Sequence, residues 1–375
     1  MQETFQLRDV FNPTIIQDFA AAIKSNWSDF DEVGFKNEII PKFPELSYGG
    51  RSNLITEKLR EFLPDDYPTA IDILLRSLMP ELEIEEISGF ERFIVMPQCA
   101  FVSRYGRDHC EVSIKALYEM TKRFTAEGDL RTFIELEPER TMAMLHEWSQ
   151  DSNCHVRRLV SEGTRPRLPL GRRLKMFIDN PKPLMALLDK LIPESTLLVR
   201  RSIANNLNDV AKDNPDIVVE TLERWRHKHP SEEMEWLIKH ASRTLIKMGH
   251  SGALKLLGFS DGAAARLENF RVVQPKIKVG DYLEFSFDLI SEGEQEQHLA
   301  IDFVVYFMKS NGKHAPKVFK LTTKTIQPGE KIQLKKRHSF KKIGIRPYYA
   351  GEHRVAIQVN GEESEAVRFW LETNV

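Results

Sequence analysis

Apolar residues in the first two thirds of the chain recur at the spacing of amphipathic helices. One such stretch starts at Pro138, which suits the first turn of a helix, and carries apolar side chains every three residues as far as Trp148. Another follows Ser195, which suits an N-cap, and keeps one apolar stripe as far as Val210. This spacing predicts helices throughout residues 1–258.

The period of the pattern changes at about residue 270. Short runs rich in β-branched and aromatic residues then alternate with turn sequences such as SNGK and QPGE. The runs span residues 282–290, 300–308, 317–326, 352–360 and 366–372. They predict an immunoglobulin-like β-sandwich over residues 270–375, joined by a linker at 259–269 to a helical domain at 1–258.

The helical domain contains internal repeats. Residues 155–166, HVRRLVSEGTRP, align with residues 198–209, LVRRSIANNLND, at an offset of 43 residues. Residues 236–247 align with the second of these segments, and residues 116–127 align one repeat before the first. Repeats of roughly 40 residues with two helices each are typical of HEAT-like solenoids. The predicted fold is therefore a HEAT-like α-helical repeat solenoid followed by a separate β domain.

The aligned repeats place polar residues at equivalent helical positions, because residues four apart share one helix face. The four sets are Arg123 and Glu127; Arg158 and Glu162; Arg201, Asn205 and Asp209; and Lys239, Arg243 and Lys247. Since the second helices of stacked repeats line one concave wall, we expect a groove edged by cations with three carboxylates inside it. The alternative is a series of intrahelical ion pairs worth about 0.2–0.5 kcal/mol each. Repetition in four units favours the groove.

Charge changes this picture only locally, because the 375-residue chain has a formal net charge of −2. Residues 155–175 contain seven Lys or Arg and the single acid Glu162, and residues 309–346 contain twelve and the single acid Glu330. Cations along a groove suit phosphates, which predicts binding to nucleic acid. Lysines that protect a strand edge are the alternative for the second segment.

Other classes of protein lack support in the sequence. Three cysteines do not make a disulfide framework and fit a reducing cytoplasm, and no apolar run is long enough to span a membrane. The pairs His109–Cys110 and Cys154–His155 lack paired metal-ligand spacing, and no nucleotide-binding glycine motif occurs. We therefore expect a cytoplasmic protein without metal or other cofactor and without a membrane partner. Nothing in the sequence requires more than a monomer.

At this level of detail the chain resembles a known family. Residues 155–169, HVRRLVSEGTRPRLP, and 199–216, VRRSIANNLNDVAKDNPD, closely resemble the signature of AlkC, a bacterial alkylpurine DNA glycosylase of the HEAT-like superfamily that includes AlkD. RYG at 104–106 also looks like an AlkC motif, and the strand-rich tail looks like the Ig-like extension of one AlkC subgroup. The resemblance implies helical repeats that cradle alkylated double-stranded DNA. It also implies hydrolysis of the N-glycosidic bond of bases such as 3-methyladenine, 3-methylcytosine and 1-methyladenine.

The resemblance also implies particular site residues. The acids at the lesion in the family fall on Glu127, Glu162 and Asp209, with Arg158 and Asn205 as neighbours. These are positions that the repeat alignment selects independently. The chain departs from the family in two places. Leu170 stands where AlkC proteins usually carry Trp, and GDLRTFI at 128–134 keeps only Arg and Phe of the usual FAIRPF.

The chemistry that the resemblance implies needs little more than carboxylates. A base methylated at N3 is a cation that leaves without protonation, and a carboxylate can stabilise the oxocarbenium-like sugar and activate water. Asp209 is expected to be the principal group, with Glu127 and Glu162 adding negative field and holding Arg158 and Arg201. The residues expected to bind DNA are Arg123, Arg157, Arg158, Arg165, Arg167, Arg172, Arg173, Arg200, Arg201, Asn205, Lys239, Arg243, Lys247, Lys335, Lys336 and Arg337.

No pair of aromatic residues suited to enclosing a flipped base is evident in the helical domain, since Trp225 and Trp236 fit packing roles better. We therefore expect bending of the duplex and capture of its backbone. Two alternatives stay open. A non-catalytic HEAT-repeat scaffold could bind DNA or protein through the same wall, although carboxylates facing phosphate would not help it. A nuclease would need acids that bind a metal, and Arg158 beside Glu162 argues against a cation there.

Overall fold

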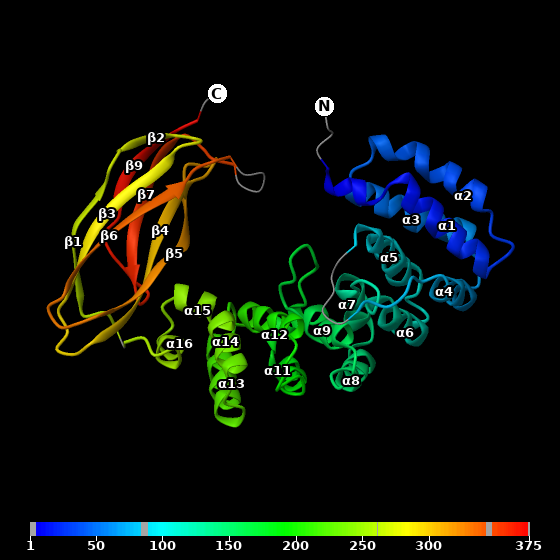
Figure 1. The fold of residues 1–375 in the computed structure, drawn as a ribbon, viewed down its shortest axis with the longest axis horizontal. Coiled ribbons are helices and arrows are strands. Elements are labelled where there is room, and N and C mark those ends of the chain that lie inside the picture. The colour runs from blue at the N-terminus through cyan, green and yellow to red at the C-terminus, as the bar shows by residue number, and fades with distance from the viewer. Residues whose placement is uncertain (1–4, 84–88, 261, 343–346, 374–375) are drawn as a thin grey trace. The chain divides into compact units, whose positions relative to one another are not determined.

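The computed structural model of the protein describes residues 5–83, 89–260, 262–342 and 347–373. The chain forms two compact units, of which the first is residues 1–214 with 229–237 and the second is residues 215–228 with 238–375. The first unit is helical, and the second combines helices with a β-sandwich (Figure 1). A helical repeat region followed by a separate β domain is the fold that the sequence predicted.

The first unit consists of short helices in antiparallel succession. They are η1 (Leu7–Val10), α1 (Pro13–Asn26), α2 (Glu32–Ile39), η2 (Ile40–Glu45), α3 (Tyr48–Phe62), α4 (Tyr67–Arg76), η3 (Phe90–Ile94), α5 (Val95–Tyr105), α6 (Cys110–Thr121), α7 (Glu127–Leu136), α8 (Pro138–Trp148), α9 (Cys154–Gly163), α10 (Lys175–Asp179), α11 (Lys182–Asp189) and α12 (Leu197–Val210). The helix α14 (Glu232–Ala241) begins in this unit and ends in the second.

One row of helices positions the predicted acids. Helix α5 packs on α7, α7 on α9, and α9 on α12, so these four helices form one row (Figure 1). The apolar stripe predicted for α12 is buried, and Val199 and Ile203 in it are fully inaccessible to solvent. Because the buried stripe fixes the rotation of each helix, the polar line on the other face keeps its place along the row.

Each of the four sets of polar residues was predicted to lie on one helix. This is correct for the two sets on α9 and α12 and wrong for the first and last sets. Helix α6 ends at Thr121, so Arg123 lies beyond it and does not share a helix face with Glu127. Lys239 lies on α14, whereas Arg243 and Lys247 lie on the separate helix α15. Helix α12 begins at Leu197 with Thr196 as its N-cap, one residue after the predicted Ser195.

The second unit contains the remaining helices and all the strands in the described part of the chain. They are α13 (Pro215–Lys228), α15 (Arg243–Lys247), α16 (Ser251–Leu256), β1 (Ala265–Val272), β2 (Lys276–Lys278), β3 (Tyr282–Ser291), β4 (Gln297–Met308), β5 (His314–Ile326), β6 (Lys331–Ser339), β7 (Gly351–Val359), β8 (Glu362–Glu363) and β9 (Val367–Glu372). One sheet has the order β1-β3-β6, and the other has the order β2-β9-β7-β4-β5 with β8 paired to β7.

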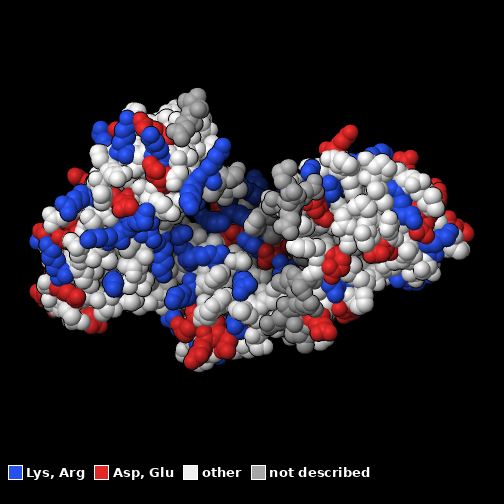
Figure 2. Space-filling model, turned by 45° about the horizontal axis from the view of Figure 1, so that its top comes forward, with Lys and Arg blue, Asp and Glu red and all other residues white. Residues whose placement is uncertain are grey.

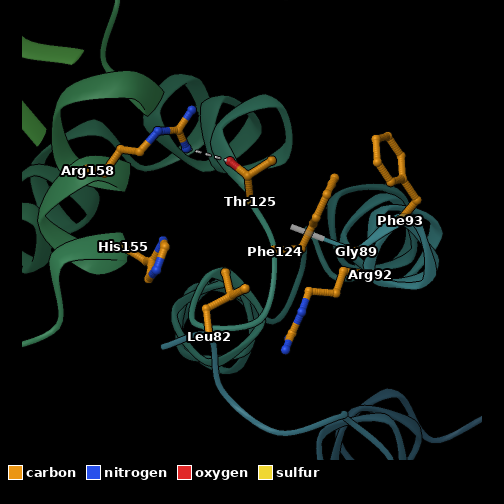
Figure 3. A pocket seen from close by; sticks show the side chains of 8 residues that line it. All are labelled: Leu82, Gly89, Arg92, Phe93, Phe124, Thr125, His155 and Arg158. Atoms are coloured by element: carbon orange, nitrogen blue, oxygen red, sulfur yellow. Dashed lines mark hydrogen bonds between the residues drawn. The ribbon is translucent and has the colours of Figure 1, made fainter. Parts of the chain in front are cut away.

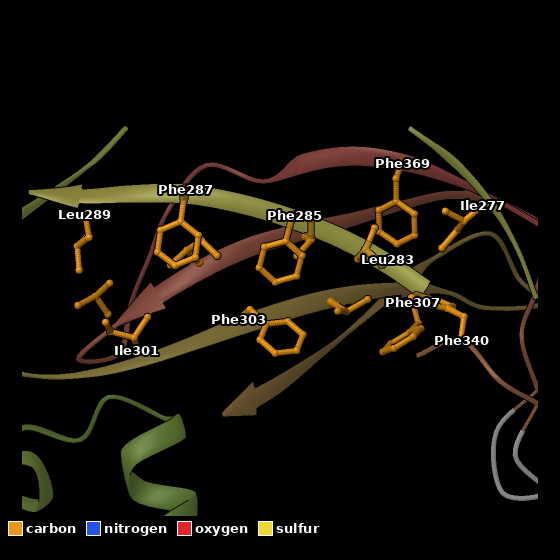
Figure 4. Packing of buried hydrophobic residues seen from close by; sticks show 14 of the residues in the cluster. Ile277, Leu283, Phe285, Phe287, Leu289, Ile301, Phe303, Phe307, Phe340 and Phe369 are labelled. Carbon is orange, nitrogen blue, oxygen red and sulfur yellow. The ribbon is translucent and has the colours of Figure 1, made fainter. Parts of the chain in front are cut away.

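The core of the sandwich lies between the two sheets. Phe285 and Phe287 of β3 face Phe303 of β4 across it, and all three side chains are almost fully buried (Figure 4). The five strands predicted from the sequence correspond to β3, β4, β5, β7 and β9. The prediction missed β6, which has only Ile332 and Leu334 as strongly apolar residues, and the short strands β2 and β8. It also missed β1, which begins inside the segment expected to be a linker.

Within the second unit, the β-sandwich is fastened to α15 and to the segments on either side of α16. Gln358 donates a hydrogen bond to the carbonyl of Lys247 at 3.0 Å, and Asn360 donates to the carbonyl of Ser260 at 2.9 Å. The backbones of Gly249 and Gly361 touch, so closely that a Cβ at Gly361 would overlap the Cα of Gly249. These contacts make the segment before β1 part of a packed junction instead of a free linker.

Because the two backbones touch at this junction, adding one methyl group there should destabilise the protein strongly. Gly361→Ala is expected to lower the free energy of unfolding by about 3 kcal/mol or more, because it adds overlap to a left-handed φ of 88°. Gly312→Ala is the matched control, since its φ is 75° and the space around it is open. That variant should cost about 1 kcal/mol. Urea unfolding of both variants checks this, and equal losses would contradict the packed junction.

Candidate active site

Two of the three predicted acids meet at one arginine. Arg165, in the loop after α9, donates from Nη1 to Glu162 Oε1 at 2.7 Å and from Nε to Asp209 Oδ2 at 2.8 Å. The three side chains are at least nine-tenths buried. The guanidinium therefore joins a carboxylate of α9 to one of α12 where the two helices pack.

The other oxygens of these two carboxylates also have donors. Ser202 Oγ lies 2.5 Å from Glu162 Oε2 and donates to it, and Lys212 Nζ lies 2.8 Å from Asp209 Oδ1. Arg165 and Lys212 carry two positive charges against the two negative charges of Glu162 and Asp209. This part of the site is thus neutralised and its oxygens are occupied.

Glu127, the third acid, is bound differently. It is the first residue of α7, and its Oε2 lies 3.5 Å from Nη1 of Arg158, which itself donates to Thr125 Oγ1 at 3.0 Å. Glu127 Oε2 is buried, and no hydrogen-bond donor reaches it from the residues that the structure describes. The positive charge of Arg158 offsets part of the cost of burying this oxygen, but the oxygen keeps lone pairs that can accept a hydrogen bond from a ligand.

A buried arginine of α7 holds the loop that carries Arg165. We call residues 164–174 the arginine loop. Arg131 of α7 is fully buried, and its guanidinium donates to the carbonyls of Gly163, Arg165 and Arg172. Burial lowers the pKa of Arg131 to about 10, and it remains charged at neutral pH. The retained Arg of the altered family motif therefore fixes the main chain beneath the site.

The tip of the arginine loop is apolar and strained. Leu170 is completely exposed and adopts a φ of 62°, in the left-handed region that non-glycine residues avoid. The turn below it is closed by a hydrogen bond from the amide of Gly171 to the carbonyl of Leu168 at 3.2 Å. The side chain of Leu170 therefore projects into solvent from a loop whose base is fixed by buried hydrogen bonds.

A cavity of about 190 Å³ opens beside Arg158 (Figure 3). Arg158 and His155 of α9 lie on one side of it, facing Phe124. Burial lowers the pKa of His155, so this ring is neutral at physiological pH. Arg158 thus reaches both the cavity and Glu127.

The chain is similar to known proteins in both sequence and structure. Residues 266–373 match the family described as "Uncharacterised protein YhaZ, C-terminal Ig-like domain". The chain is 35% identical over 364 residues to the uncharacterized protein YhaZ of Bacillus subtilis (strain 168), which covers 97% of this chain and 98% of that protein. The structure of Pseudomonas fluorescens alkylpurine DNA glycosylase AlkC bound to DNA containing an abasic site analog superposes with a TM-score of 0.86. It is 33% identical and covers 98% of this chain and 100% of that chain. The chain belongs to the AlkC family.

Membership of the AlkC family, in the subgroup with the Ig-like domain, confirms the resemblance found at residues 155–169 and 199–216. Several of the cations expected to bind DNA instead make ion pairs or packing contacts within this AlkC-family protein. Arg157 is paired with the buried Glu194 at 2.7 Å, and Arg123 with Glu119 at 2.7 Å. Arg200 donates to the carbonyl of Ser195 and lies over the ring of Trp236, 5.6 Å from its centroid.

Other expected cations of the AlkC-family chain lie at its surface. Arg167 pairs with Asp213 and Arg172 with Glu135, whereas the side chains of Arg173, Arg201, Lys239 and Lys247 are exposed. Asn205 and Arg243 are partly buried and make interactions within the protein. The exposed cations can bind a phosphate more readily than the paired ones, because an exposed cation can reach a phosphate without giving up a buried partner.

In the Ig-like domain, Lys335, Lys336 and Arg337 follow one another along β6. Together with Arg271 of β1 they line a groove of about 670 Å³ on the three-stranded sheet. Arg337 pairs with Glu284 at 2.8 Å, and Lys335 is exposed. Figure 2 shows Lys and Arg side chains gathered on this domain, at the left of the view.

Sequence reasoning missed several groups at the candidate site. Ser202 and Lys212 bind the two neutralised acids, and Asp129 lies beside Glu127 on α7. Lys212 follows Asp209 by one helical turn, which is a signal that could have been used. Ser202 could not have been found, because its partner is 40 residues away and only packing brings them together.

The described part of the chain contains no group of three or more His, Cys, Asp or Glu residues suited to a metal ion. In particular, His155 and Cys154 do not gather further ligands there. No helix among the described residues is long and apolar enough to cross a membrane.

Proposed function

We propose that this protein is a DNA repair glycosylase that hydrolyses the N-glycosidic bond of small cationic alkylated bases in duplex DNA. Membership of the family of AlkC, whose solved structure is bound to DNA containing an abasic site analog, supports this proposal. The observation that carries it is the buried Glu127 oxygen, which no hydrogen-bond donor among the described residues reaches, in the row of helices that also carries the two fully paired acids. 3-Methyladenine, 3-methylcytosine and 1-methyladenine are the proposed substrates.

The three carboxylates differ in their hydrogen bonds, and we therefore assign them different roles. Glu127 has the free acceptor, so it is the group that would hold the attacking water and face the positive sugar. Glu162 and Asp209 have no unoccupied oxygen, and they would fix Arg165 and contribute field. This shifts the principal role from Asp209, which the sequence favoured, to Glu127.

The proposed DNA contacts follow from exposure. Arg173, Arg201, Lys239, Lys247 and Lys335 are free to approach phosphates, whereas Arg123, Arg157 and Arg200 would serve packing. Leu170 would meet the duplex with an aliphatic side chain, in place of the aromatic contact usual for the family. Apolar wedges of this kind unstack and bend DNA.

The proposal can be tested on methylated duplex DNA with EDTA present. We expect free 3-methyladenine and 3-methylcytosine to appear in the supernatant while the phosphodiester backbone stays intact. A non-catalytic scaffold would bind the DNA and release nothing. In a parallel reaction without EDTA, a metal-dependent nuclease would shorten the strands. Either of those results would replace the glycosylase proposal.

A further inference from the structure

The cavity beside Arg158 has no part in the proposed mechanism. The residues that line it include Leu82, Arg92, Phe124, His155 and Arg158 (Figure 3). Its volume of about 190 Å³ is below the roughly 300–1,000 Å³ of pockets for drug-sized ligands, so it suits one small ring system. Arg158 connects the cavity to the proposed site, because its Nη1 also lies 3.5 Å from Glu127 Oε2.

One wall of the cavity is an aromatic ring. Phe124 lies in the turn between α6 and α7 and is only partly buried. Its ring packs against that of Phe93, with centroids 4.9 Å apart, and Phe93 in turn lies 6.4 Å from Phe90. Figure 3 shows the Phe124 ring edge-on, with Phe93 on one side and His155 on the other. A planar heterocycle in the cavity can therefore stack on the ring face that is turned away from Phe93.

Two polar side chains opposite this ring keep hydrogen-bonding capacity. Arg158 has five N–H donors, of which the described residues take one hydrogen bond, at Thr125 Oγ1 3.0 Å away. His155 is buried, and its Nε2 lies 3.4 Å from the carbonyl of Glu83. Because burial lowers the pKa of His155, the ring is neutral, and with the proton on Nε2 its Nδ1 is an acceptor. The cavity thus offers a ligand both donors and an acceptor.

The charge of the cavity disfavours a cation. Arg92 and Arg158 are both positive, and the Arg92 guanidinium is fixed by a hydrogen bond to the carbonyl of Pro80 at 3.0 Å. None of the described residues that line the cavity is an acid. Glu127 offsets part of the charge of Arg158 but does not line the cavity. A neutral ring therefore enters this space more readily than a positive one.

The base in the proposed reaction changes its charge at the moment of cleavage. A base methylated at N3 is positive while it is attached to the sugar. When the N-glycosidic bond breaks, the electron pair of that bond stays on the base nitrogen. The base becomes neutral, and the sugar takes the positive charge until water adds at C1′ and gives up a proton through Glu127 to the solvent. Only the free base thus matches the cavity in charge.

We propose that this cavity is a product site, which binds the neutral, amino-bearing base after the base has left the sugar. This inference rests on the proposed glycosylase function. The free base stacks on Phe124, accepts a hydrogen bond from Arg158 and donates one from its amino group to His155 Nδ1. A base held there is separated from the sugar cation and does not recombine with it.

The binding of free 3-methyladenine to the full chain tests this site without DNA. Isothermal titration calorimetry compares 3-methyladenine with 3,9-dimethyladeninium, which keeps the positive charge of the attached base. The wild type should bind the neutral base at least about tenfold more tightly than the cation, because the cation meets two guanidinium groups.

Two variants change the cavity from opposite sides. Phe124→Leu removes the stacking face, and Leu82→Phe narrows the space; each should weaken the binding of 3-methyladenine by about fivefold or more. Phe62→Leu is the matched control. Phe62 of α3 is partly buried like Phe124 and packs on Phe35, with centroids 5.6 Å apart. It should bind 3-methyladenine with wild-type affinity, and urea unfolding verifies that each variant is folded.

Weaker binding in Phe124→Leu and Leu82→Phe, with wild-type binding in Phe62→Leu, supports the product site. Three results overturn it and leave the glycosylase function standing: no binding of 3-methyladenine, equal affinity for the cation, or wild-type affinity in both cavity variants. If the protein binds 3-methyladenine but releases no base from methylated DNA in EDTA, the glycosylase function fails, and the product role fails with it.

Discussion

Glu127→Gln is expected to slow base release by about a hundredfold or more, which is the usual effect of removing one preorganised electrostatic group. Glutamine keeps the size of the side chain but removes the charge that faces the sugar and the oxygen that activates water. Since the Arg158 contact at 3.5 Å is long and partly exposed, the loss of the ion pair should cost little stability. DNA affinity should stay within a few fold.

The matched control lies on the same helix. Glu135→Gln changes the same kind of side chain in α7, and its partner Arg172 is 2.9 Å away at the surface. Single-turnover release by this variant should equal that of the wild type. A Glu127→Gln protein with wild-type rate would exclude Glu127 as the group that acts on the sugar and would return the principal role to Asp209.

Arg165→Met should have the largest effect on stability in the helical unit. It leaves buried oxygens of Glu162 and Asp209 without their shared cation, and breaking a buried ion pair on one side costs about 3–5 kcal/mol. Activity should be lost as well, because the arginine loses its place between α9 and α12. Urea unfolding with unchanged m-value would measure the loss.

Arg167→Met is the control for this substitution. Arg167 is two residues further along the same loop and pairs with Asp213, but about a quarter of each side chain is exposed. That variant should lose at most about 1 kcal/mol. If both variants unfold at the same urea concentration, Arg165 is not the central element of a buried charge network.

The sequence predicted the parts of the site that repeat along the helical row. Glu162 and Asp209 lie at equivalent places because α9 and α12 each bury an apolar stripe with helical spacing, which can be recognised in the sequence. Arg165 was expected to bind DNA, and the structure instead ties it to both acids. A local pattern shows that a cation is present, but its partner depends on which helix packs next to it.

The end of a helix was harder to predict than its interior. Arg123 and Glu127 have the four-residue spacing of one helix, yet the chain turns between α6 and α7. Strand β6, which pairs with β3, was also hard to predict, because its lysines and arginines hide the regular alternation of its side chains. The contacts of Asn360 and Gln358 with the helices could not be foreseen, because they join segments about a hundred residues apart.

The most direct test of the account uses a duplex that carries one 3-methylcytosine, incubated with the protein in EDTA, with the products identified by mass spectrometry. The account predicts free 3-methylcytosine and a full-length strand with one abasic site in equal amounts, and neither product with Glu127→Gln on the same time scale. An unchanged strand that is merely bound, or one cut without loss of the base, would contradict it.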